Sequence, residues 1–127
     1  MAAHQNVATA LVIGAVLGGL GAEGLHAQVK PIAYVIAEIE VNNQDAYAKE
    51  YLPPSSKALL DGGAKYLARG SRTLALKGEP PKRIVLLAFE SLEQAQAAYS
   101  SPAFVEAALI GEQHAKFRIF AVEGIPQ

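Results

Sequence analysis

Apolar and polar residues alternate along residues 31–41, PIAYVIAEIEV. Val35 and Ile39 fall on one side of an extended chain, whereas Tyr34 and Glu38 fall on the other. One side is wholly apolar and the other is mixed. This pattern predicts a strand in a sheet that helices cover on one face only.

Residues 45–61 carry a helical pattern, and Asn42-Asn43 offers an N-cap directly before it. Pro53-Pro54 lies inside this pattern. Because a proline within a helix loses a hydrogen bond and clashes one turn back, the pair predicts a kink or two separate helices. Gly62-Gly63 predicts the end of the helical region.

Two further strands are predicted, over residues 64–78 and 82–90. Gly70-Ser71, in the middle of the first, indicates a bulge or a bend. The turn between them falls at residues 78–81, GEPP. The second strand, KRIVLLAFE, is a nearly continuous apolar run, which is typical of a central strand.

Two helix starts follow the third strand. Ser91 and Gln94 fit a capping box, and Ser101 precedes Pro102 at the first helical position, where a missing N–H costs nothing. Gly111 then predicts the end of the helix. The side chains expected to face inward are Leu92, Ala95, Ala98, Tyr99, Phe104, Val105, Ala108 and Leu109.

Residues 116–124, KFRIFAVEG, predict a fourth strand. The order of strand, helix, strand, strand, helix, strand predicts an α+β, ferredoxin-like βαββαβ domain with four antiparallel strands and both helices on one face. The other face needs a cover. A homodimer would supply one by packing sheet against sheet.

An apolar stretch at residues 7–20, VATALVIGAVLGGL, differs from the rest of the chain. It is shorter than the roughly 20 residues that a membrane-spanning helix needs. Residues 25–27 form a weak A-x-A-like cleavage pattern, so we expect a signal peptide at 1–27, a single domain at 28–127 and export to the periplasm. An uncleaved anchor is the alternative.

The chain has 11 Lys and Arg against 12 Asp and Glu. Glu23 is the only acid before Gln28, so the mature domain is neutral, and we expect neither nucleic-acid nor membrane binding after leader cleavage. With no Cys, and with His4 and His26 in the leader, a zinc site lacks ligands. We expect no metal and no cofactor, although a haem would need only one axial ligand such as His114.

Arg69 and Arg72 flank the predicted bend. Because Arg holds a carboxylate in a fixed fork, the two residues are candidates for an anion clamp. Salt bridges to Glu38, to Glu90 or to a dimer partner are the alternative.

Glu38 and His114 are the candidates for a catalytic acid or base, since burial would raise the pKa of a carboxyl into a useful range. A solvated carboxylate and a helix-end histidine are the alternatives. Tyr34, Tyr66 and Tyr99 could orient a ligand or simply pack. The predicted ligand-binding residues are Tyr34, Arg69, Arg72 and Tyr99.

Six segments, AYVIAEIEV, DAYAKEY, GGAKYLARG, KRIVLLAFES, AAYSSPAF and AVEG, resemble the domain-of-unknown-function family 1330 over residues 32–124. The resemblance implies a dimeric α/β-barrel fold and no established activity. Related dimeric barrels include small monooxygenases, isomerases and haem-dependent enzymes, so the fold is a poor guide to chemistry. The family often has Glu before and Pro after the third-strand Phe, where this chain has Ala88 and Glu90.

Taken together, the residues predict an exported homodimer that binds a small molecule in a cavity between sheet and helices. One alternative is a cofactor-free monooxygenase- or isomerase-like enzyme, with Glu38 or His114 as base and Arg69 or Arg72 as anion clamp. A second is a structural or interaction module.

Overall fold

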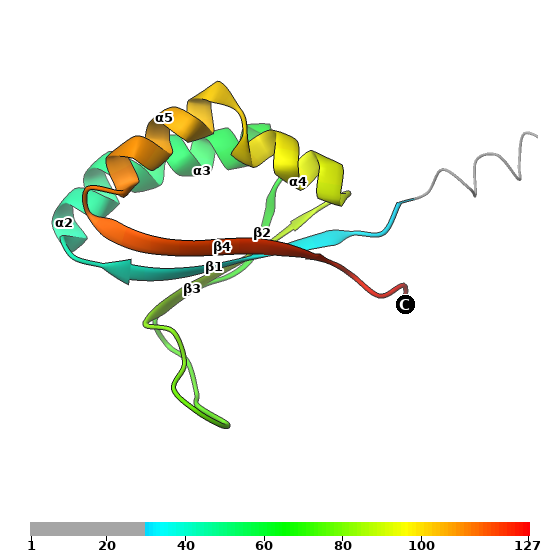
Figure 1. Cartoon of the computed structure of the whole chain (residues 1–127), viewed down its shortest axis with the longest axis horizontal. Helices are drawn as coiled ribbons and strands as arrows, with labels where there is room; N and C mark the ends of the chain where they lie inside the picture. Colours follow the sequence, from blue (N-terminus) through cyan, green and yellow to red (C-terminus); the bar gives the residue numbers. More distant parts are fainter. Residues whose placement is uncertain (1–29) are drawn as a thin grey trace, which may run out of the picture. The chain divides into compact units, whose positions relative to one another are not determined.

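Four strands form one antiparallel sheet in the order β2-β3-β1-β4. Helices cover one face of this sheet, and no helix of residues 30–127 lies on the other face (Figure 1). The βαββαβ plan is therefore confirmed. The strands are β1 (Ala33–Val41), β2 (Lys65–Gly70), β3 (Arg83–Phe89) and β4 (Ala115–Glu123).

This computed structural model describes residues 30–127, of which Pro31–Gln127 form one compact unit. The signal peptide predicted at residues 1–27 lies outside the described residues. Within residues 30–127, no helix is both long enough and apolar enough to cross a bilayer.

The two sides of β1 differ as the alternation predicts. Val35, Ala37 and Ile39 are buried toward the helices, whereas Tyr34 and Glu38 are half-buried on the opposite face. We call the helix side the covered face and the opposite side the open face.

The first helical region differs from the prediction at its prolines. It runs without a break through α2 (Gln44–Ala46), a π-helical turn η1 (Tyr47–Tyr51) and α3 (Leu52–Asp61). Pro53-Pro54 occupies the first turn of α3, so the irregularity lies one turn earlier than predicted. In the wider π-turn the Leu52 N–H donates to the Tyr47 carbonyl. This turn makes room for the two proline rings, which would clash with the preceding turn of a regular α-helix.

The second strand is shorter than predicted. Its bulge lies between Tyr66 and Ala68, and the strand ends at Gly70, whose φ of 140° only glycine adopts readily. Residues 71–82 then project from the sheet on the side away from the helices (Figure 1). Leu74 and Leu76 on this loop are 82% and 91% exposed.

Both predicted caps after the third strand are confirmed. The Ser91 hydroxyl accepts a hydrogen bond from the Gln94 N–H at the start of α4 (Leu92–Tyr99), and the Ser101 hydroxyl accepts one from the Phe104 N–H at the start of α5 (Pro102–Gly111). The Gln94 side chain reaches back to the N–H of Glu90, one residue before the cap.

The buried side of α5 agrees with the prediction at Phe104 and Ala108 but not at Val105 and Leu109. Phe104, Ala107 and Gly111 are buried, whereas Val105 and Leu109 are exposed. Gly111 lies against the Tyr51 ring so closely that a Cβ there would come within 2.5 Å of it. The helix therefore approaches the π-turn through its smallest residues.

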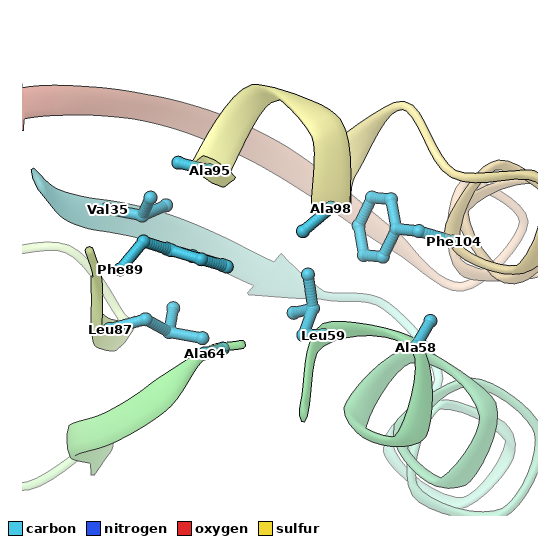
Figure 2. Packing of buried hydrophobic residues seen from close by; sticks show 9 residues of the cluster. All are labelled: Val35, Ala58, Leu59, Ala64, Leu87, Phe89, Ala95, Ala98 and Phe104. Atoms are coloured by element: carbon cyan, nitrogen blue, oxygen red, sulfur yellow. The ribbon is translucent and has the colours of Figure 1, made fainter. Parts of the chain in front are cut away.

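The larger core cluster lies between the covered face, α3 and α4 (Figure 2). The Phe89 ring packs beneath Val35, and Leu87 from the same strand lies beside it. Small residues let the helices approach closely, since a Cβ on Gly62 would come within 2.6 Å of the Ala98 Cβ. The cluster consists of Val35, Ala58, Leu59, Ala64, Leu87, Phe89, Ala95, Ala98 and Phe104.

Candidate functional site

A small cavity lies between the covered face and the helices, and tyrosines from three elements line it. Its volume is about 40 Å³, which is room for a water molecule or two, whereas ligand pockets usually measure roughly 300–1,000 Å³. We call this cavity the tyrosine pocket. Its tyrosines are Tyr47, Tyr51, Tyr66 and Tyr99.

The π-turn positions two of these rings. Tyr47 and Tyr51 stand at its two ends, both are buried, and their ring centres lie 5.3 Å apart. Phe117 of β4 completes the wall, with its ring centre 5.1 Å from that of Tyr51. The irregular turn thus places both hydroxyl-bearing rings in a second core cluster, together with Ala37, Ile39 and Ala115.

An open groove of about 510 Å³ adjoins the tyrosine pocket, between α4 and β4. Its walls are mostly apolar, with Val35 and Leu92 among them and Gln96 as the polar exception. Tyr99 and Ile119 line both the groove and the pocket, so these two side chains separate the two spaces.

Burial keeps Tyr47, Tyr51 and Tyr99 protonated. It raises the pKa of Tyr51 to about 12, against the opposing effect of Ser55, and it raises the pKa of Tyr99 still further. It also raises the pKa of Tyr47, although the charge of Arg83 opposes this. At neutral pH these three phenolic groups can therefore donate hydrogen bonds but cannot act as bases.

Two arginines stand beside the pocket on the covered face. The Arg69 guanidinium lies 5.4 Å from the centre of the Tyr66 ring, and that of Arg83 lies 5.3 Å from the centre of the Tyr47 ring. The Tyr66 hydroxyl donates to the Ser56 hydroxyl at 3.3 Å. The two guanidinium groups and the hydroxyl groups therefore lie together on the covered face.

The other predicted residues lie elsewhere. Tyr34 and Glu38 are on the open face, where Oε2 of Glu38 is 3.6 Å from Nε of Arg118. Arg72 is exposed on the loop of residues 71–82. His114 follows α5, and its Nε2 is 2.8 Å from Oε2 of Glu50.

The structure thus brings together only part of the predicted set. Arg69, Tyr66 and Tyr99 meet at the tyrosine pocket. The sequence reasoning did not assign Tyr47 and Tyr51 to the site, although their i, i+4 spacing placed them on one side of a helix. It also missed Arg83, whose position in β3 has the same parity as Leu87 and therefore faces the helices.

The pocket lining suits recognition of oxygen atoms. Besides apolar side chains it offers tyrosine and serine hydroxyls and the Arg69 guanidinium, and among the described residues no carboxylate or imidazole lines it. Within residues 30–127, no group of three or more His, Asp and Glu side chains could hold a metal ion.

The fold and the pocket define a ferredoxin-like α+β domain with a small, tyrosine-lined cavity under its helices. The chain belongs to DUF1330, a domain of unknown function, whose family model matches residues 32–125. This confirms the resemblance seen in the sequence. No curated protein matches the chain.

Solved structures with the same fold are distant in sequence. A protein of unknown function from Rhodopseudomonas palustris is 17% identical, with a TM-score of 0.62 over 82% of this chain and 94% of that one. SnoaB, a cofactor-independent oxygenase from Streptomyces nogalater, is 10% identical, with a TM-score of 0.50 over 76% and 96%. An ethyl tert-butyl ether D (EthD) family protein from Bacillus halodurans is 9% identical, with a TM-score of 0.52 over 75% and 99%. At these identities the similarity shows the fold alone.

Proposed function

We propose that the tyrosine pocket binds a small organic molecule through hydrogen bonds to its oxygen atoms. One observation carries this proposal: four tyrosines and Arg69 converge on a cavity whose remaining walls are largely apolar. Ligand sites typically combine apolar walls with a few convergent polar groups.

A ligand larger than water requires the pocket to open. Rotation of the Tyr99 ring would join the pocket to the adjoining groove, because Tyr99 lines both. The combined space would then fall within the usual range for ligands. Half-buried Tyr99 contacts Phe104 and Phe89 edge-on or tilted, with ring centres 4.6 and 6.2 Å away, so its movement is linked to the core.

The geometry supports binding more strongly than catalysis. The enzymatic alternative, a monooxygenase or isomerase without a cofactor, needs a base to remove a proton from its substrate. Glu38 lies on the open face and His114 pairs with Glu50, so neither lines the pocket. The buried Tyr51 is protonated and cannot take that role.

We also propose that the domain forms a homodimer through its open face. Ile36 of β1 lies opposite Leu86 of β3 and Phe120 of β4, so an apolar row crosses three strands. Phe120 is 43% exposed. A contiguous apolar surface of this kind favours association, and a twofold arrangement would cover it in both copies.

Export completes the proposal. The apolar stretch at residues 7–20 supports a signal peptide that is removed after Ala27, which would release the domain into the periplasm. The mass of the mature chain tests this directly. A chain that retains its first 27 residues after export would contradict it.

The binding proposal is tested by native mass spectrometry of protein purified from the periplasm, which reports oligomer mass and retained ligand together. Tyr51→Phe removes one pocket hydroxyl at constant shape, and Tyr34→Phe is the matched control on the open face. We expect bound mass in the wild type and in the control, and about tenfold weaker retention in Tyr51→Phe, as expected for one lost hydrogen bond. Equal retention in both variants would place the ligand outside the pocket.

A further inference from the structure

Arg69 and Arg83 have no acidic partner in the part of the chain that the structure describes. Within residues 30–127, neither forms an ion pair with an Asp or Glu side chain. Acidic residues are nevertheless present in the strand next to β3, since Glu38 and Glu40 belong to β1. Their carboxylates lie on the open face, where they pair with Arg118 and Lys82.

The two arginines are also close to each other. Arg69 lies opposite Val85 in the register of β2 and β3, and Arg83 precedes Val85 by two residues, so both project from the covered face. Diagonal neighbours of this kind have Cβ atoms about 7 Å apart. Two long guanidinium side chains at that spacing can reach a single anion.

The aromatic rings do not substitute for an anion. A cation over an aromatic ring gains only about 0.5–1 kcal/mol at an exposed site, whereas an Arg–carboxylate contact provides two parallel charge-assisted hydrogen bonds. Both arginines also oppose the burial effect on the pKa of Tyr47, which indicates that both charges act toward the pocket. The local field therefore favours a negative group at the pocket rim.

We infer that the ligand of the tyrosine pocket is a small organic acid whose carboxylate is bound at the rim by Arg69 and Arg83. This inference rests on the proposed binding function. The inference assigns Arg83 as a ligand-binding residue. The sequence-based prediction pairs Arg69 with Arg72, whereas the inference pairs it with Arg83.

The walls of the pocket define the rest of the ligand. Part of the wall consists of side chains that offer no charge and no hydrogen-bonding group, namely those of Ile39, Val85, Leu87 and Phe117. A polyhydroxylated body such as a sugar acid would leave the hydroxyl groups that lie against this apolar wall unsatisfied. A compact aromatic or alicyclic body would stack on the tyrosine rings instead.

Benzoate is the probe for this inference, and benzyl alcohol is its uncharged counterpart with the same ring. We expect calorimetric titration of the purified protein to show benzoate binding at least tenfold more tightly than benzyl alcohol. Added salt should weaken benzoate alone, because exposed charges are screened. Arg83→Gln and Arg69→Gln should each weaken benzoate at least tenfold and leave benzyl alcohol unchanged.

Arg118→Gln on the open face and Arg72→Gln on the loop are matched controls, and both should retain wild-type affinity for benzoate. Arg83→Lys keeps the charge but loses the planar fork, so it should restore only part of the affinity lost in Arg83→Gln. Thermal unfolding of each variant shows whether it is folded.

Two results would overturn the inference, and they have different meanings. The first is equal binding of benzoate and benzyl alcohol that does not change in Arg83→Gln and Arg69→Gln. This result would agree with a binding pocket but would show that it does not select an anion. Absence of binding by either probe to the wild-type protein at millimolar concentration would overturn the inference and the proposed function together.

Discussion

The two faces of the sheet differ in the partners of their positively charged side chains. On the open face, Arg118 pairs with Glu38 and Lys82 pairs with Glu40. On the covered face, Arg69 and Arg83 lie over aromatic rings and have no acidic partner within residues 30–127.

This difference comes from strand parity. Side chains two residues apart share a face, so Glu38 and Glu40 both lie on the open side of β1. The formal net charge of −1 conceals this arrangement. A nearly neutral chain can therefore carry an unneutralised cationic site, because the sheet separates the opposite charges onto different faces.

The largest expected effect distinguishes the faces by their packing. Leu87, which is 1% exposed, and half-buried Leu86 are consecutive residues of β3 that point to opposite faces. We expect Leu87→Ala to lower the free energy of unfolding by about 2–4 kcal/mol, as for other buried leucines, and Leu86→Ala to lower it by about 1 kcal/mol in the monomer. Urea denaturation at low protein concentration measures both.

Dimerisation would sharpen this comparison. If the open face is covered in the dimer, the loss of unfolding free energy caused by Leu86→Ala should grow with protein concentration. The loss caused by Leu87→Ala should not. If the two substitutions lowered the free energy of unfolding by the same amount at every protein concentration, the distinction between the faces would be contradicted.

An intermediate effect is expected at alkaline pH. The pKa of Tyr51 rises from 10.0 to about 12 on folding, so the unfolded chain loses this proton first. The stability that depends on the neutral phenol is complete below pH 10 and is lost as the pH rises toward 12, at roughly 1.4 kcal/mol per pKa unit. Urea midpoints between pH 9 and 12 should fall less steeply in Tyr51→Phe, and identical slopes would contradict the burial argument.

The smallest effect is expected on the open face. Glu38→Gln removes the partner of Arg118, which is mostly exposed, so the pair should contribute no more than about 0.5 kcal/mol. Unfolding measurements should show this small change, and benzoate titration should show none. Loss of benzoate binding in Glu38→Gln would move the binding site to the open face.

Much of the fold was predictable because local rules decided it. The alternation in β1 and the capping residues Asn43, Ser91 and Ser101 act within a few residues, and the structure shows each of them in its predicted role. The buried side of α5 was not predictable in this way, because it depends on the close approach of Gly111 to the π-turn.

The site was less predictable than the fold. In β3 the continuous apolar run hides which residues face the helices, so Arg83 could not be assigned from its neighbours. Likewise, the pairing of β2 ends at Gly70 rather than continuing through residues 71–78, and this leaves Arg72 on the loop. Register and strand length are properties of the assembled sheet, which local patterns do not contain.

The π-turn also bears on how the length of this chain can change during evolution. One extra residue in an α-helix normally rotates everything beyond it by about 100° around the axis. A π-turn absorbs that residue locally, so α3 keeps its orientation toward the sheet while the segment before it is longer. Homologues that are one residue shorter after Asn43 and that lack both prolines should therefore have an uninterrupted α-helix here.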